Sequence, residues 1–267
     1  MRAYFTYFKL KFISGLQYRS AAWAGIATQF FFGFVYIMVY VAFYESGGKN
    51  LPMSLSQIVT YLWLNQALLA LVNQFSRDQE LFKIIKDGTI SYELVRPKNL
   101  YFMWYFKVLG QRLSNVLLRF FPLIFVTSFL PKPFGLGLPI SFFSFVLFVI
   151  SLSVGTLLVT ALTVLYPIIT LTTMNEKGLV NLMITMADIL SGLVVPIPFF
   201  PVFLQKISRL LPFQYISDLP FRIYVGNVGI IPGIFGVSVQ LIWLFILIFM
   251  GLFLMKKSLR RVVVQGG

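Results

Sequence analysis

Long apolar runs separated by short polar and charged segments dominate the pattern of this chain. Four of the runs carry no charged side chain, and they cover residues 20–44, 50–76, 133–175 and 223–255. An α-helix rises ~1.5 Å per residue and the hydrocarbon core of a bilayer is ~30 Å thick, so about 20 apolar residues are enough to cross it. Each run reaches that length, and the pattern therefore predicts a polytopic membrane protein.

The ends of these runs predict an all-α polytopic membrane protein with six transmembrane helices in a single domain, residues 1–267. The expected spans are about 21–44, 57–75, 101–130, 141–170, 178–195 and 230–255. The third span contains Lys107, Arg112 and Arg119, whose long side chains are expected to reach back toward the headgroups. The fifth span is short and contains Asp188.

Basic residues between the spans predict the orientation. With both termini in the cytoplasm, 17 of the 22 Lys and Arg residues lie inside, and Lys49, Lys132, Lys206, Arg209 and Arg222 lie outside. Cytoplasmic loops of membrane proteins carry such an excess. Aromatic and basic residues interleave over residues 2–19, which favours an interfacial helix over a frayed basic tail. The expected location is the plasma membrane of a bacterial cell, which makes the lipid bilayer a partner of the chain.

Composition narrows the possible chemistry. The chain has no Cys and no His, which removes thiolate metal sites, Cys nucleophiles and the commonest general base. We therefore predict no catalytic residue, no metal ligand and no cofactor bound by this chain. The net charge of +14 belongs to residues that flank apolar spans, so anionic headgroups rather than nucleic acid are the expected partner.

The densest charged stretch, residues 77–88, reads as a short amphipathic helix between the second and third spans. Ser76 and Gln79 have capping-box spacing, and Gly88 suits the position after a helix end. Its apolar face needs a partner, which is either the membrane surface or another protein. Acidic side chains in the same stretch would meet anionic lipid unfavourably, which favours a protein.

A family resemblance is carried by the residues that follow, Gly88, Ile90, Leu94, Arg96 and Pro97, and by the basic, aromatic start of the next span. The stretch resembles ABC-2 type permeases, in particular a six-span branch often described as uncharacterised or multidrug exporters. The resemblance implies that this segment couples the permease to a cytoplasmic ATPase. The coupling role would then fall to Leu81, Phe82, Ile84, Ile85, Gly88, Ile90, Glu93, Leu94, Arg96 and Pro97. Pro97 also disfavours helix at the residue before it, so a merely structural elbow is the alternative.

The same resemblance implies partners and an energy source. Members work as permease pairs on an ABC ATPase dimer, which would bind ATP and Mg, and in this branch a heterodimer is favoured over a homodimer. The sequence agrees in one respect, because it contains no G-x-x-x-x-G-K-[ST] phosphate-binding loop. Energy for transport would therefore arrive from another chain.

Polar residues inside two spans form stripes at helical spacing. In the fifth span Asn181, Thr185, Asp188 and Gly192 share one face and form the candidate translocation pathway, with a structural role for Asp188 as the alternative. In the first span Gly25, Gln29, Gly33, Tyr36 and Tyr40 form a face that could pack against a second permease subunit. The regular Ser and Thr seam of the fourth span, from Ser153 to Thr170, favours helix packing.

The chain after the fifth span is rich in proline and aromatic residues. Three prolines in six residues prevent a straight helix, and stranded aromatic side chains argue against a loop in water. By resemblance, re-entrant or interfacial helices at this place would close the outer end of the pathway. The candidate outer gate is Pro196, Pro198, Phe199, Phe200 and Pro201.

Together the patterns predict a permease subunit of an ATP-driven ABC-2 type exporter that moves an amphiphilic or hydrophobic substrate, drug-like or lipid-linked, by alternating access. An ATP-independent secondary transporter or channel is the alternative, although the two halves of the chain show no internal repeat. An intramembrane enzyme would have only one buried carboxylate to work with. An ABC importer is disfavoured because the E-A-A-x-x-x-G loop motif is absent from the sequence.

Overall fold

The computed structural model describes residues 2–17, 19–47, 51–74, 78–95, 97–173 and 178–260, and every regular element within these ranges is a helix. The predicted all-helical class is therefore confirmed for the described residues. In chain order the α-helices are α1 (Arg2–Gly15), α2 (Arg19–Glu45), α3 (Leu55–Val72), α4 (Gln79–Lys86), α5 (Ser91–Leu94), α6 (Leu100–Ser128), α7 (Phe142–Thr173), α8 (Leu179–Leu190), α9 (Val202–Leu210), α10 (Asp218–Tyr224) and α11 (Ile230–Leu259). Two 3₁₀ turns, η1 (Ile197–Phe199) and η2 (Phe213–Tyr215), lie between α8 and α10.

Among the described residues, four helices are long and apolar enough to cross a membrane, namely α2, α3, α7 and α11. The expected third span is the 29-residue helix α6, but its three basic residues lower its apolar character. The expected fifth span is the 12-residue helix α8, which at ~1.5 Å per residue extends only ~18 Å. The structure thus places a helix at each expected span, while the count of six complete crossings is not confirmed.

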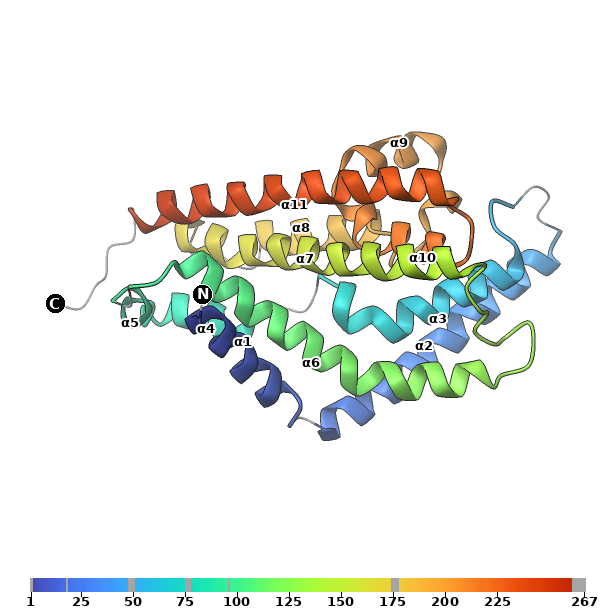
Figure 1. Ribbon diagram of the computed structural model, residues 1–267, viewed down its shortest axis with the longest axis horizontal. Coiled ribbons are helices and arrows are strands. Elements are labelled where there is room, and N and C mark those ends of the chain that lie inside the picture. Colours follow the sequence, from blue (N-terminus) through green and yellow to red (C-terminus); the bar gives the residue numbers. More distant parts are fainter. Residues whose placement is uncertain are drawn as a thin grey trace.

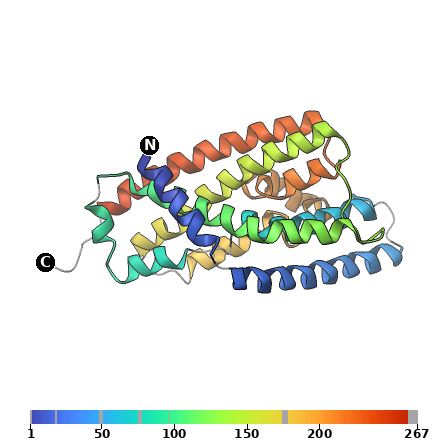
Figure 2. The ribbon, with the colours of Figure 1, turned by 60° about the horizontal axis from the view of Figure 1, so that its bottom comes forward.

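Helix α7 forms the centre of the bundle. It packs against α11 on one side and against α3, α6 and α10 on others, and its Thr hydroxyls bond back to carbonyls of their own helix. Figure 2 shows α2 and α11 on opposite edges of the bundle, with α3, α6 and α7 between them. This arrangement leaves one long face of α2 and one of α11 exposed and apolar.

The two ends of the bundle differ in their short elements. Helices α4 and α5 lie at one end together with α1 and the C-terminal end of α11, whereas η1, α9, η2 and α10 lie toward the other (Figure 1). Glycines permit the close approach of α1 to α6, because a Cβ at Gly110 would lie 2.8 Å from the carbonyl oxygen of Phe8. Short helices between α8 and α11 are present as expected, and their depth in a membrane stays a prediction.

Capping residues explain where two helices begin. Ser54 and Gln57 form a capping box at the start of α3: the backbone nitrogen of Gln57 donates to the Ser54 hydroxyl, and the Gln57 side-chain oxygen accepts from the Ser54 backbone nitrogen. The sequence-based cap for α4 was wrong. Helix α4 begins at Gln79 and is capped by Asp78, whose carboxylate accepts from the backbone nitrogens of Glu80 and Leu81. Ser76 lies outside the described residues.

The glycine face of α2 packs within this chain, so its assignment to a second subunit was wrong. A Cβ at Gly33 would lie 2.5 Å from the ring of Trp63 on α3, and a Cβ at Gly25 would lie 2.6 Å from the guanidinium of Arg119 on α6. Spacing identified a close-packing face correctly, but it carries no information on whether the neighbour belongs to the same chain.

Candidate functional site

An ion-pair network attaches α4 to the rest of the molecule. The ammonium of Lys107 on α6 lies 2.9 Å from Asp78 and 2.9 Å from Glu80, and Lys11 of α1 lies 2.8 Å from the same Glu80 oxygen. The Lys107 side chain is 0% exposed and that of Asp78 is 5% exposed, whereas Glu80 is 52% exposed. Burial alone would raise the pKa of Glu80, but the hydrogen bonds and charges of Lys107 and Lys11 lower it below its ordinary value of 4.5.

The apolar face of α4 has its partner inside this chain. Leu81, Phe82 and Ile85 are buried, Ile90 beyond the helix is buried as well, and α4 packs against α7. The expectation that this face meets another protein was therefore wrong for these residues, because the tertiary fold already covers them. Ile84 is half-buried. The amphipathic helix itself was predicted correctly, because a helix that is covered on one side has apolar residues on that side.

The exposed part of this segment is α5 and its flanks. Tyr92 is 75% exposed and Val95 is 84% exposed, and Leu94 and Pro97 are exposed too. Gly88 has φ +69°, which suits the turn that follows α4. Arg96 lies outside the described residues.

A hydrogen bond fixes α5 to α6. The indole Nε1 of Trp104 donates to a carboxylate oxygen of Glu93 at 2.8 Å. Trp104 is buried in the core of the bundle and Glu93 is half-buried. The exposed apolar tip, Tyr92, Leu94 and Val95, is therefore held at a defined place at this end of the molecule.

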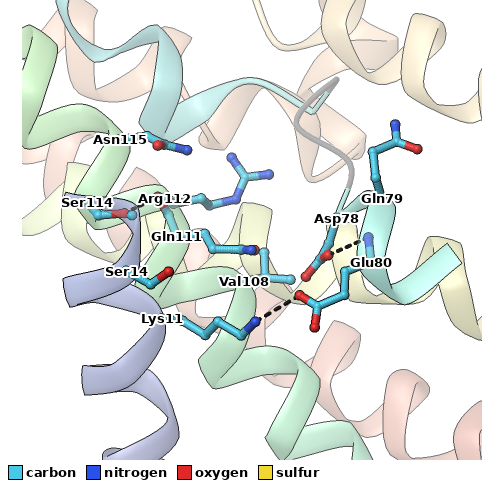
Figure 3. Close-up of a pocket in the computed structure, with 11 residues that line it drawn as sticks. Lys11, Ser14, Asp78, Gln79, Glu80, Val108, Gln111, Arg112, Ser114 and Asn115 are labelled. Carbon is cyan, nitrogen blue, oxygen red and sulfur yellow. Dashed lines mark hydrogen bonds and ion pairs between the residues drawn. The ribbon is translucent and has the colours of Figure 1, made fainter. Parts of the chain in front are cut away.

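A pocket of about 370 Å³ opens beside the network (Figure 3). It lies between α1, α4 and α6; Lys11 extends from α1 toward Glu80 on α4, and Arg112 lines it from α6. Polar side chains form most of the rest of its lining, including Ser14, Gln111 and Asn115.

Arg112 closes the end of α3 from the side of α6. Its guanidinium donates to the carbonyl oxygens of Leu71 at 2.9 Å and Asn73 at 2.7 Å, and to the hydroxyl of Thr163 at 2.7 Å. Cations suit this place because the last carbonyls of a helix have no partner within it. The side chain is fully buried, so Arg112 joins α3, α6 and α7 in the interior. The expectation that it reaches back to the headgroups was wrong.

Asp188 lies at the same junction. One of its carboxylate oxygens accepts from the backbone nitrogen of Gln74 at 3.3 Å, and the side-chain amide of Gln74 in turn accepts from Tyr166 at 2.8 Å. Within the described part of the chain no ion pair involves Asp188, so pairing with a basic residue of the third span is not observed.

The four residues of the expected pathway stripe do not share one environment. Asn181 and Thr185 are exposed on α8, while Asp188 is buried. Gly192 does not continue the stripe, because α8 ends at Leu190 and Gly192 lies in the following turn with φ +83°. A Cβ at Gly192 would lie 2.8 Å from the hydroxyl of Tyr61, so its conformation and close packing explain the glycine.

A second pocket, about 260 Å³, forms a groove between α2, α3 and the end of α8. Asp188 lines it together with Gln29, Asn65 and Asn73, and most of the other lining residues are apolar or aromatic. The sequence stripe on α8 thus located one residue of this groove. The amides of α2 and α3 were missed as partners because only the tertiary fold brings them to Asp188.

The proline-rich segment after α8 is fixed by one buried carboxylate. Asp218 of α10 accepts from the backbone nitrogen of Ile197 and the hydroxyl of Tyr61, each at 3.1 Å, and pairs with Arg222 at 3.2 Å. Sequence reasoning missed Asp218, although a lone carboxylate within an apolar stretch was a usable signal.

The expected gate residues lie around this anchor. Pro196 is buried, Pro198 and Phe200 are half-buried, and Pro201 is exposed at the start of α9. The ring of Phe199 packs against that of Tyr40 on α2, with centroids 5.4 Å apart. The segment therefore contacts the same helix that forms one wall of the groove.

Known proteins were compared with this chain. A family model described as "ABC-2 family transporter protein" matches residues 30–266. No curated protein sequence and no solved structure matches this chain. The match covers every helix from α3 to α11 and more than half of α2.

Proposed function

This chain belongs to the ABC-2 family of transporter proteins, and we propose that it is the membrane-spanning permease subunit of an ATP-driven exporter. The α4–α5 segment is its coupling element, docking on a cytoplasmic ABC ATPase. The substrate is an amphiphilic or hydrophobic molecule, which moves out of the cytoplasm by alternating access. ATP and Mg would bind to the ATPase subunits, because the chain contains no phosphate-binding loop of its own.

One observation carries the proposal beyond the family match. The α4–α5 segment is attached to α6 and α7 by three sets of contacts, and yet it presents an exposed apolar tip. Lys107 ties it to α6, Phe82 and its neighbours bury it against α7, and Glu93 ties the tip to Trp104. Tyr92, Leu94 and Val95 remain uncovered at the end of the molecule. A segment so built transmits a displacement of its tip to the bundle instead of absorbing it.

The route from this tip to the groove is continuous through packed residues. Lys107 and Arg112 lie on the same helix, α6, and Arg112 holds the end of α3 through the carbonyls of Leu71 and Asn73. Asn73 lines the groove beside Asp188. We assign the groove to the translocation pathway, with Asp188 as the pathway residue and the 196–201 segment as the outer gate.

Charge supports the orientation that this function needs. The end of the bundle that carries α4 and α5 also carries Lys11, Lys83, Lys98, Lys256 and Lys257, whereas Lys206 and Arg209 lie on α9 at the other end. An excess of basic residues marks the cytoplasmic side. Both termini would then be cytoplasmic, in a bacterial plasma membrane, and the exposed apolar side of α2 would face a second permease subunit, in a heterodimer rather than a homodimer.

Co-purification tests the proposal directly. The tagged full chain is isolated in mild detergent from its native membrane, and the partners and the ATP hydrolysis of the complex are measured. We expect an ABC ATPase and a second permease to be recovered. A stable chain with neither partner and no ATP hydrolysis would overturn the proposal in favour of an ATP-independent transporter or channel.

A matched pair of variants tests the docking tip. Val95→Glu places a charge on the exposed tip, and Val202→Glu places the same charge on an equally small exposed residue of α9 at the other end. We expect Val95→Glu to lower ATPase recovery at least tenfold while Val202→Glu leaves it unchanged. Equal recovery with both variants would remove the tip from the docking surface.

A further inference from the structure

The groove between α2, α3 and α8 contains buried polar atoms that have no hydrogen-bond partner among the described residues. They are the Oε1 and Nε2 atoms of Gln29, the Oδ1 atoms of Asn65 and Asn73, and the Oδ2 atom of Asp188. Gln29 is 3% exposed, Asn65 is 2% exposed and Asp188 is 4% exposed. Buried polar groups in folded proteins are nearly always paired, so this convergence on one groove indicates a ligand site.

The remaining hydrogen bonds of these residues show that the site is built. The side-chain amide nitrogen of Asn65 donates to the carbonyl oxygen of Leu193 at 2.8 Å, which restrains this side chain at the groove. The other oxygen of Asp188 accepts from Gln74, and the carbonyl of Asn73 accepts from Arg112. Hydrogen bonds therefore hold the side chains of Asn65 and Asp188 and the backbone of Asn73.

The kinds of unpaired atom define the ligand's polar end. Four of the five are acceptors, and one of these belongs to a carboxylate, while Gln29 Nε2 is the only donor of the set. A matching ligand must therefore supply several N–H or O–H donors together with positive charge. A primary ammonium has three N–H donors and one positive charge, whereas a quaternary ammonium has the positive charge without donors, and a sulfate ester has no donor and a negative charge.

The walls of the groove define the ligand's other end. Most of the remaining lining comes from Phe32, Tyr36, Leu69, Leu193 and Val194. A volume of about 260 Å³ holds a head group and the first part of a chain, and the exposed apolar side of α2 continues beyond it. The buried guanidinium of Arg112 donates to the Leu71 and Asn73 carbonyls and to Thr163, and among the described residues it forms no ion pair with Asp188.

We propose that this groove binds an amphiphile with a protonated primary amine, whose N–H groups donate to Asp188, Asn65, Asn73 and Gln29 while its hydrocarbon lies against α2. The identification of this amphiphile as the transported substrate rests on the proposed transport function. The binding itself does not, because it needs neither an ATPase nor ATP.

Direct binding to the full chain tests the proposal. The chain is placed in nanodiscs of phosphatidylcholine, a lipid without a primary amine, and titrated calorimetrically with dodecylamine, dodecyltrimethylammonium and dodecyl sulfate, after subtraction of empty nanodiscs. We expect dodecylamine to bind at least tenfold more tightly than either of the others. Equal binding of the primary and quaternary amines would overturn the proposal, as would no binding of dodecylamine, which would leave the groove to water.

Variants identify the site of binding. Gln29→Leu removes two of the unpaired atoms and breaks no side-chain hydrogen bond among the described residues, so the variant should fold. Asp188→Asn removes the charge. The matched control is Gln111→Leu, which removes an amide from the other pocket. We expect Gln29→Leu and Asp188→Asn each to weaken dodecylamine binding at least tenfold, and Gln111→Leu to leave it unchanged. Wild-type affinity in both groove variants would refute the site even if the ATPase co-purifies.

Discussion

Lys107→Met is the sharpest test of how α4 is attached to the bundle. The substitution keeps the length and the apolar stem of the side chain but removes the ammonium that lies 2.9 Å from both Asp78 and Glu80. Asp78, which is 5% exposed, would be left as a buried carboxylate without its cation. Glu80 would keep Lys11 as a partner.

The two carboxylates contribute unequally. Removing one partner of a buried ion pair destabilises by about 3–5 kcal/mol, because the other charge stays buried and unpaired. Because Glu80 is 52% exposed, its ion pair with Lys107 counts as an exposed pair. Exposed ion pairs typically contribute about 0–1 kcal/mol to stability. Loss of about 3 kcal/mol from the local opening free energy corresponds to on the order of 100-fold faster amide exchange.

Hydrogen–deuterium exchange of the full chain measures this opening in residues 79–86. We expect on the order of 100-fold faster exchange there in Lys107→Met, and less than about fivefold in the control Lys11→Met, whose pair is partly exposed. Adding Asp78→Asn to Lys107→Met should slow the exchange again, because the asparagine keeps the helix cap but carries no charge. Unchanged exchange in Lys107→Met, or faster exchange in the double variant than in the single one, would refute the reasoning.

Three further outcomes follow from other parts of the structure. A Cβ at Gly155 would lie 2.7 Å from a backbone oxygen of the η2–α10 segment, so Gly155→Val should destabilise by about 1–3 kcal/mol and lower the thermal midpoint, unlike Gly178→Ala, which meets nothing. Because the pKa of Glu80 is lowered in the folded protein, its carboxylate stabilises the attachment of α4 fully above pH 4.5, and this stabilisation is lost as the pH falls through the lowered pKa. Spin-label distances between α1 and α4 should therefore broaden only below pH 4.5. The same broadening in a Glu80→Gln protein would contradict the assignment. The chain has no Cys, so Val95→Cys and Leu138→Cys are unique labelling sites, and an impermeant maleimide should reach them from opposite sides of the membrane; reaction from one side only would contradict the orientation.

Much of the helical framework could be predicted from local patterns. Apolar runs predicted α2, α3, α7 and α11 to within a few residues, because a helix long enough to cross a bilayer needs a run of that length. The amphipathic pattern predicted α4 for a similar reason, since a one-sided apolar face marks a covered helix. The resemblance in residues 88–97 agrees with the family match over 30–266.

The candidate site was predicted less completely. Asp188 could be singled out because a carboxylate in an apolar span is unusual, but its neighbours Gln29 and Asn65 lie on helices 123 or more positions away in the chain. Gly192 was assigned to a helical stripe that ends before it, because helix ends are set by contacts such as those of Tyr61.

The sequence by itself determined which segments are helices and which of their faces are apolar or polar, because both follow from the order of neighbouring residues. Only the tertiary structure decided what each face meets. It turned the apolar face of α4 and the glycine face of α2 inward, and it placed Lys107 between Asp78 and Glu80. It also gathered unpaired amide oxygens around Asp188. A face needs only a partner of matching shape and polarity, and many segments of a membrane protein satisfy that condition. The choice among them depends on the packing of the whole bundle.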